Sequence, residues 1–252
     1  MTAGRPVTAG RPVTRLLDPA ALVRHWVDDD AVRRPVLAWS LPPGWRAISS
    51  AVVGGGIGGV DWWFNAQVDL NYSHPDPAAH ARELARGLGL AGDGVAMLTA
   101  ADVGGFRYAV DGGVEVVATV GLGLPVPAAA SEQAQQYEVG TINVLVLVPA
   151  TLGDAALVNL VITVTEAKTQ ALTEAGVPGT GTSSDAVCIA AQAVSADGLP
   201  IEPILDPDLL YGGPRSRWGS RVARAVHAAV AAGTADWIHR HPPGDPHRFW
   251  AG

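Results

Sequence analysis

The sequence predicts an α/β protein, folded as a single layered domain with a mixed β-sheet and packed helices. Apolar stretches typical of strands come in pairs between stretches of helical periodicity, instead of alternating with them one by one. No long linker interrupts the 252 residues, and 48% of them are hydrophobic, which is enough for one substantial core. Paired strands between helices favour a mixed sheet over a doubly wound parallel sheet.

The chain begins with a tandem repeat, Thr-Ala-Gly-Arg-Pro-Val, at residues 2–7 and again at residues 8–13. Such a short segment, rich in glycine and proline, cannot bury a core of its own. We therefore expect residues 1–14 to form a disordered tail and residues 15–252 to form the single domain.

The first half of the chain predicts two helices and most of the strands. Asp76 followed by Pro77 is typical of a helix N-terminus, and Gly87 is suited to the end of that helix. A Pro-Pro-Gly turn at residues 42–44 separates two strands. The predicted helices are residues 16–26 and 77–86, and the predicted strands are residues 36–39, 46–53, 64–70, 95–100, 107–110 and 114–120.

The second half predicts a strand, a long helix and a second strand, followed by a last helix. Thr151 with Asp154 three residues later resembles a capping box at the start of the long helix, and Gly176 is suited to its end. Continuous apolar runs rich in β-branched residues predict strands that are buried on both faces. The predicted strands are residues 143–148 and 186–191, and the predicted helices are residues 155–175 and 217–232.

Glu166 and Lys168 lie on different faces of the long predicted helix. At 100° per residue, Glu166 falls in a polar stripe, whereas Lys168, the only lysine in the chain, falls among apolar residues. An ion pair between them within the helix is geometrically poor, so each needs another partner. For Lys168, a structural role, either snorkelling to solvent or pairing with a carboxylate, stands beside a catalytic one. The polar stripe contains Asn159, Thr163, Glu166 and Gln170.

Composition and charge exclude several classes of protein. The net charge of −7 and the placement of Arg217, Arg221 and Arg224 along one helical face do not favour nucleic-acid binding. The chain shows neither a signal peptide nor an apolar stretch long enough to cross a bilayer, so we expect a cytoplasmic protein without a membrane partner. The single cysteine, Cys188, lies in an apolar run and is expected to be buried.

Two motifs suggest sites that their surroundings do not support. Gly54-x-Gly56-x-x-Gly59 matches a dinucleotide fingerprint, but residues 61–64, Asp-Trp-Trp-Phe, break the helix that such a site requires. A tight turn or a bulge is the simpler interpretation of these glycines. His74 and His80 lack a third ligand at a suitable spacing, so we predict no metal site.

One combination of short motifs resembles the adenosylcobinamide amidohydrolase family of cobalamin salvage. The motifs are Gly140-Thr141-Ile142-Asn143 before a strand, Glu166-Ala167-Lys168-Thr169 on the next helix, and Gly179-Thr180-Gly181-Thr182 leading to Asp185. The resemblance extends over about residues 47 to 232 and departs from the family at residues 122–127. It implies hydrolysis of the amide between the corrin ring and its aminopropanol arm, with the corrinoid as substrate and no cofactor.

This resemblance also assigns expected roles. We expect Glu166 to act as the base if it faces a closed cleft, Lys168 or Asn143 to donate to the oxyanion, and Asp185 to orient Lys168. A hydroxyl nucleophile at Thr141, Thr182, Ser183 or Ser184, with Lys168 as its base, is the rival assignment. Trp62 and Trp63 offer ring faces for a flat macrocycle or adenine. The expected ligand-binding residues are Gly55, Gly56, Asn65, Gln67, Thr99, Thr141 and Thr182.

A second class of function stays open at this point. A noncatalytic corrinoid-binding module would perturb the spectrum of the corrinoid just as an enzyme would, but it would release no aminopropanol. The sequence also leaves a homo-oligomer possible.

Overall fold

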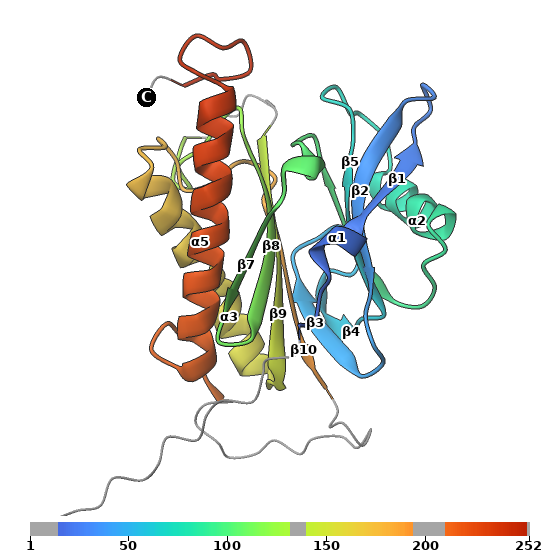
Figure 1. Ribbon diagram of the computed structural model, residues 1–252, viewed down its shortest axis with the longest axis vertical. Coiled ribbons are helices and arrows are strands. Elements are labelled where there is room, and N and C mark those ends of the chain that lie inside the picture. The colour runs from blue at the N-terminus through green and yellow to red at the C-terminus, as the bar shows by residue number, and fades with distance from the viewer. Residues whose placement is uncertain (1–14, 132–139, 194–209, 251–252) are drawn as a thin grey trace, which may run out of the picture.

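The protein is built in four layers, in which two β-sheets face each other and helices cover the outer face of each sheet (Figure 1). The computed structural model describes residues 15–131, 140–193 and 210–250, and the tail predicted at residues 1–14 lies outside them. The predicted α/β class, with mixed strands and packed helices, is confirmed. The strands are divided between two sheets instead of one.

The four-stranded sheet has the order β1-β2-β5-β6. β5 and β6 are parallel and are connected through α2, while the other neighbours are antiparallel. Phe64 and Ala66 on the outer face pack against Ala81 and Leu84 of α2. This part of the chain contains α1 (Pro19–Leu22), β1 (Val23–Val27), β2 (Arg33–Ser40), β5 (Trp62–Gln67), α2 (Pro77–Gly87) and β6 (Gly94–Thr99).

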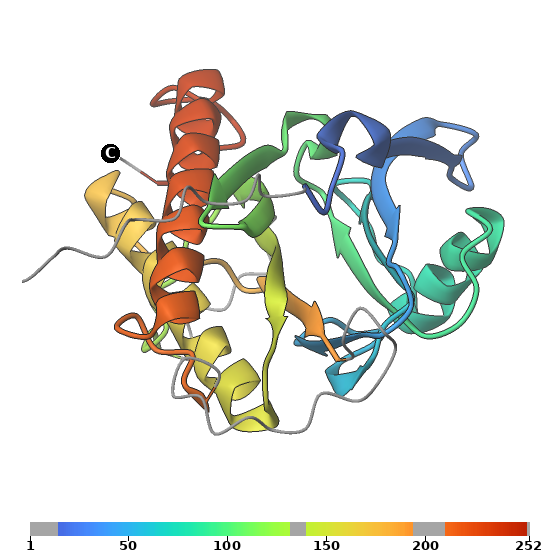
Figure 2. The same ribbon diagram turned by 60° about the horizontal axis from the view of Figure 1, so that its bottom comes forward.

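The six-stranded sheet has the order β4-β3-β10-β9-β8-β7. β9 and β10 are parallel and are joined through α3, which confirms the predicted succession of strand, helix and strand. α3 and α5 lie side by side on the outer face of this sheet (Figures 1 and 2). Its elements are β3 (Trp45–Ser49), β4 (Gly56–Gly59), η1 (Val103–Gly105), β7 (Arg107–Asp111), β8 (Val114–Leu122), β9 (Gly140–Thr151), α3 (Asp154–Glu174), β10 (Ala186–Gln192) and α5 (Arg217–Arg240).

The layer between the two sheets changes from apolar to polar along the strands. Near its middle, Trp63 and Met97 of one sheet face Leu145 and Cys188 of the other, and Cys188 is buried as predicted. Every second residue of a strand points to the same face. The same inward faces therefore continue into polar residues at one end of the layer. These are Asn65, Gln67, Thr99, Thr119, Thr141 and Asn143.

Near the N-terminus, the predicted helix at residues 16–26 is wrong. Asp18 caps a helix of a single turn, α1, through a hydrogen bond from the N–H of Ala20 at 3.1 Å. The chain then becomes β1, whose residues pair with β2 from Val23↔Leu37 to Val27↔Arg33. Pairing with a neighbouring strand overrides the weak local preference for a helix.

The glycine-rich segment also differs from the prediction. The strand predicted at residues 46–53 ends at Ser49, and the glycines expected to form a turn or bulge instead form the edge strand β4. Gly54, with φ +74°, has no room for a side chain because a Cβ there would overlap the carbonyl oxygen of Gly94.

The predicted helix boundaries are confirmed at the start of α2 and differ in part at α3 and α5. Asp76 caps α2 by accepting the N–H of Ala79 at 2.9 Å, as predicted. The predicted capping box of α3 is wrong, because Thr151 ends β9 and Gly153 is the N-cap. α5 continues beyond the predicted residue 232 to Arg240. None of the helices in the described ranges has the length and apolar character to span a membrane.

Candidate functional site

A chain of side-chain hydrogen bonds joins the two sheets at the polar end of their shared layer. Asn143 Nδ2 donates to Asn65 Oδ1 at 2.9 Å and to the carbonyl of Leu98 at 3.2 Å. Asn65 Nδ2 in turn donates to Thr119 Oγ1 at 2.9 Å. These side chains are almost fully buried, so their bonds fix the orientation of both amides. Asn143 Oδ1 is buried without a partner among the described residues.

Asp185 collects four interactions at the start of β10. Its carboxylate accepts the N–H of Ile142 at 2.9 Å, the N–H of Thr182 at 3.2 Å and the Thr182 hydroxyl at 2.6 Å, and it forms an ion pair with Lys168. Lys168 is 8% exposed, which confirms the prediction that it lies on the buried side of its helix and close to Asp185. A Cβ on Gly181 would overlap both charged groups, so a larger residue there would displace the ion pair.

The hydroxyl groups of the same region are bonded to one another. Thr141 Oγ1 lies 2.7 Å from Ser184 Oγ, and Ser184 donates to the carbonyl of Gly140 at 3.0 Å. Thr182 Oγ1 lies 2.7 Å from the same carbonyl oxygen, so its single hydrogen is shared between that oxygen and Asp185. Within the described ranges, the Lys168 ammonium has a hydrogen bond to Asp185 and none to these hydroxyls. The structure therefore shows no contact for the rival assignment, in which Lys168 activates a hydroxyl nucleophile.

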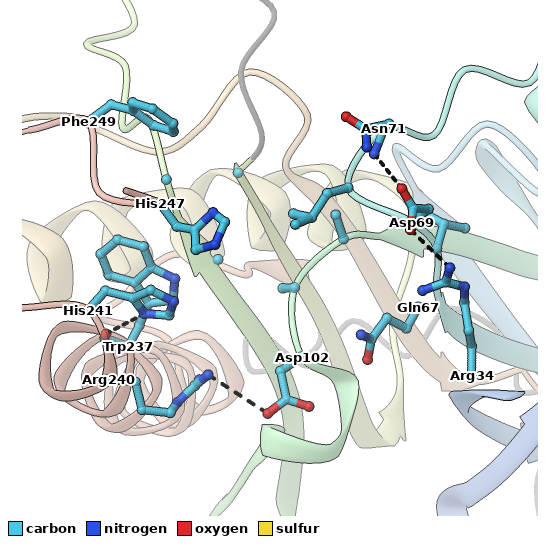
Figure 3. Close-up of a pocket in the computed structure, with 17 residues that line it drawn as sticks. Arg34, Gln67, Asp69, Asn71, Asp102, Trp237, Arg240, His241, His247 and Phe249 are labelled. Carbon is cyan, nitrogen blue, oxygen red and sulfur yellow. Dashed lines mark hydrogen bonds and ion pairs between the residues drawn. The ribbon is translucent and has the colours of Figure 1, made fainter. Parts of the chain in front are cut away.

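A pocket of about 630 Å³ opens at this polar end, between the ends of the strands and the end of α5 (Figure 3). Gln67, Gly121 and Gly140 line it from the strands. The segment after α5 folds back over the end of β8, because the N–H of Phe249 donates to Gly123 O at 3.1 Å and Trp250 Nε1 donates to Leu122 O at 2.8 Å. Further lining side chains are Trp237, Arg240, His241, His247 and Phe249.

His241 is held in one orientation inside this pocket. Its ring stacks on Trp237 with 4.3 Å between the centroids, and its Nδ1 lies 2.9 Å from the carbonyl oxygen of Trp237. A carbonyl only accepts, so Nδ1 carries the hydrogen and, in the neutral ring, Nε2 keeps a free lone pair. This tautomer, assigned from the hydrogen bond, suits a group that takes a proton from water.

Charged side chains stand on opposite sides of the pocket. Arg34 binds both Asp28 and Asp69, and Arg240 contacts Asp236 at 3.0 Å and Asp102 at 3.8 Å. Burial opposes ionisation of Asp28, but the N–H of Val32 and the Arg34 guanidinium outweigh it and hold the pKa of Asp28 below its ordinary value. The N–H of Asn71, supported by Arg34, likewise lowers the pKa of Asp69. Both carboxylates are therefore ionised at neutral pH.

Glu166 was expected to act as the base if it faced a closed cleft, and this condition is not met. Glu166 is exposed on the outer surface of α3, in an open groove beside Thr169 and Gln170. The apolar side of α3 packs on the six-stranded sheet, so its polar stripe faces outward at this point. Glu166 is consequently not brought together with Asn143 and Asp185.

Among the predicted ligand-binding residues, Gln67 lines the pocket and the others do not. Gly55 and Gly56 are at β4, on the edge of the six-stranded sheet, with β3 and β10 between them and β9. Trp62 and Trp63 are buried in the core, so neither offers a free ring face. Thr99 is also buried, and its hydroxyl accepts the N–H of Ala101 at 3.0 Å beside the pocket.

The structure therefore brings together most of the predicted residues but adds a group that sequence reasoning missed. Asn65, Gln67 and Thr99 of one sheet meet Thr141 and Asn143 of the other, next to the Lys168–Asp185 pair. Missed were the pocket residues contributed by β2, by the loop after β5 and by the end of α5. The only available signal was the run His-Arg-His-Pro-Pro at residues 239–243, which has no spacing typical of a site.

The described residues offer no ready metal site. No group of three or more His, Cys, Asp or Glu side chains within those ranges is arranged to hold a metal ion. The His74 and His80 rings stack on each other, with 5.0 Å between their centroids.

Two facing mixed sheets with a polar pocket and an oriented histidine at one end define a layered α/β protein equipped for acid–base chemistry. The family model described as adenosylcobinamide amidohydrolase matches residues 20–242. A Methanosarcina mazei protein named adenosylcobinamide amidohydrolase is 30% identical over 188 residues, which are 75% of this chain and 89% of that protein. The chain belongs to the adenosylcobinamide amidohydrolase family, and it is an amide hydrolase that acts on a corrinoid.

Two further proteins are more distantly similar. An uncharacterised protein of Methanocaldococcus jannaschii is 29% identical over 93 residues, which are 37% of this chain and 35% of that protein. A crystal structure of a Pyrococcus horikoshii OT3 protein aligns with 83% of this chain and with 78% of the Pyrococcus chain, at 10% sequence identity and a TM-score of 0.38.

Proposed function

We propose that this protein hydrolyses the amide joining the aminopropanol arm to the corrin ring of adenosylcobinamide, and that it serves corrinoid salvage in the cytoplasm. The products are adenosylcobyric acid and 1-amino-2-propanol. Membership of the family supports the reaction. The observation that supports our choice of active site is the oriented His241 in the 630 Å³ pocket. A pocket of this size suits a side arm of the corrinoid that reaches in from the surface.

The proposed reaction needs one proton acceptor and one stabiliser of negative charge. Nε2 of His241 takes a proton from water, whose oxygen bonds to the amide carbon, and the same imidazolium then protonates the leaving nitrogen as the C–N bond breaks. The guanidinium of Arg240, in the same pocket, is our candidate to stabilise the oxyanion. No cofactor enters this scheme, because the corrinoid is the substrate.

We assign the predicted buried residues a supporting role in this scheme. Asp185 is paired with Lys168 and accepts hydrogen bonds from the N–H of Ile142 and the Thr182 hydroxyl. The Thr182 hydroxyl also contacts the carbonyl of Gly140, which lines the pocket. Asn143 links the polar ends of the two sheets through its hydrogen bonds to Asn65 and to the carbonyl of Leu98. A rigid surrounding shell of this kind keeps reacting groups in the productive geometry.

The experiment is to incubate the protein with adenosylcobinamide and to measure 1-amino-2-propanol by mass spectrometry. We expect release of the amine by the wild-type protein and a loss of about 10²-fold or more in kcat with His241→Gln. The matched control is His239→Gln, because His239 is exposed in the last turn of α5, two residues before His241, and does not line the pocket. Spectral evidence of corrinoid binding without any amine would instead favour the noncatalytic corrinoid-binding module.

A further inference from the structure

A second pocket, of about 490 Å³, adjoins the first. Arg34, Val68, Asp69 and Asn71 line both, so the two pockets are neighbouring compartments of one surface depression. Figure 3 shows three of these shared residues, Arg34, Asp69 and Asn71, on the side of the first pocket opposite α5. We call the second compartment the aromatic pocket, because its remaining wall is formed by Trp26, Tyr72, His74 and His80 together with Asp28, Asp29, Asp30 and Ser73.

The rings of the aromatic pocket form an ordered stack. The centroids of His74 and His80 are 5.0 Å apart with 19° between the ring planes, and Tyr72 stacks on His80 at 5.5 Å. Trp26 meets the edge of His80 at 5.5 Å. The Tyr72 hydroxyl lies 2.8 Å from His80 Nδ1, which locks the two rings together. A rigid stack of this kind presents a preformed surface to another flat ring.

The carboxylates that line the aromatic pocket differ in whether they already have hydrogen-bond or ion-pair partners. Asp28 and Asp69 are both bound by Arg34. The carboxylates of Asp29 and Asp30, in contrast, make no hydrogen bond or ion pair among the described residues. Both side chains are exposed and line the aromatic pocket, so they can accept hydrogen bonds from N–H groups of a ligand that stacks on the rings.

We infer that the aromatic pocket binds the adenine ring of the adenosyl group while the aminopropanol arm occupies the first pocket. This inference rests on the proposed function for the identity of the whole ligand. A purine offers a π-face for stacking on Tyr72 and His74, and the exocyclic amine of adenine supplies two N–H donors for Asp29 or Asp30. The shared wall between the compartments lets one molecule reach both.

The first test measures nucleoside binding without any turnover. We expect 5′-deoxyadenosine to bind the full-length protein by calorimetry, and His74→Ala to weaken that binding by about tenfold or more. Asp29→Asn combined with Asp30→Asn should weaken it as well, and inosine, which lacks the exocyclic amine, should bind less tightly than adenosine. The control is His239→Ala, outside both pockets. Absence of nucleoside binding, or unchanged binding in both variants, overturns the inference.

The second test separates this inference from the proposed function. We expect the wild-type protein to prefer adenosylcobinamide to dicyanocobinamide in kcat/KM for amine release, and His74→Ala to reduce that ratio about tenfold while leaving dicyanocobinamide turnover within about twofold. An unchanged ratio with active enzyme overturns the adenine site alone. If no corrinoid releases amine, the proposed function fails, and the calorimetry still decides whether the aromatic pocket binds the purine.

Discussion

At the scale of single residues, the Lys168–Asp185 pair does more than neutralise a buried charge. The carboxylate is shared by an ammonium on α3, a backbone N–H on β9 and two groups of the loop before β10. Three segments that are distant in sequence therefore meet at one side chain. Such a junction is sensitive, because removing one charge of a buried pair leaves the other uncompensated.

We predict that Lys168→Met lowers the free energy of unfolding by about 3 kcal/mol. Methionine keeps the apolar stem and deletes the ammonium, so Asp185 loses its ion pair and keeps only the neutral donors of Ile142 and Thr182. Lys168→Arg should also destabilise, because the bulkier guanidinium must fit where the Lys168 ammonium lies close to Gly181. Denaturant unfolding measures both variants. A change below about 1 kcal/mol in Lys168→Met would mean that the pair behaves as an exposed one.

Asn143 gives the second prediction at this scale. Asn143→Ala removes the donor from two buried acceptors, Asn65 Oδ1 and the carbonyl of Leu98, so we expect the free energy of unfolding to fall by about 2 kcal/mol or more. Asn71→Ala serves as the control, because Asn71 is exposed and should change stability by less than about 0.5 kcal/mol. Equal effects in the two variants would show that the link between the sheets contributes nothing to stability.

At the scale of elements, α2 introduces a dependence of stability on pH. Burial lowers the pKa of His80, and the neighbouring His74 lowers it further. As the pH falls, the unfolded chain therefore takes up a proton at this position before the folded protein does. His80 contributes its full stability above its ordinary pKa of about 6.5 and loses it progressively as the pH falls below that value.

We therefore expect the free energy of unfolding to decrease between pH 7 and pH 5, and His80→Gln to flatten that part of the profile. Urea unfolding at a series of pH values provides the measurement. The carboxylates with lowered pKa values, such as Asp28 and Asp69, contribute their own decrease only at lower pH, so the two windows are separable. An identical slope in the variant would assign the decrease to other groups.

The elements also show which parts of this fold can be read from the sequence. α2 and α3 were predicted nearly to their ends, because periodicity and turn residues are local signals. β4 was not predicted, because four residues of the type Gly-Ile-Gly-Gly become a strand only by pairing with β3. For the same reason, His241 was missed, since its place in the pocket depends on how the residues after α5 return to the end of β8.

At the scale of the whole molecule, we predict that hydrolysis survives prolonged treatment with EDTA. The proposed chemistry uses side chains of the protein, and the described residues contain no cluster of three or more metal-binding side chains. Amine release after chelation and gel filtration measures the outcome. If activity is lost and a particular divalent ion restores it, the carboxylates of the pocket act as metal ligands, and the metal-free mechanism proposed above is wrong. The cobalt of the corrinoid is not counted in this experiment.

The six-stranded sheet joins segments that are far apart in the sequence, because β3 near residue 45 pairs with β10 near residue 190. On a ribosome, β3 has emerged long before its neighbour exists. Since 137 positions separate Ser49 from Ala186, the wait lasts roughly 7 to 27 s at about 5–20 residues per second. Throughout that interval the nascent chain carries a strand with an unpaired edge, which is open to pairing with other chains.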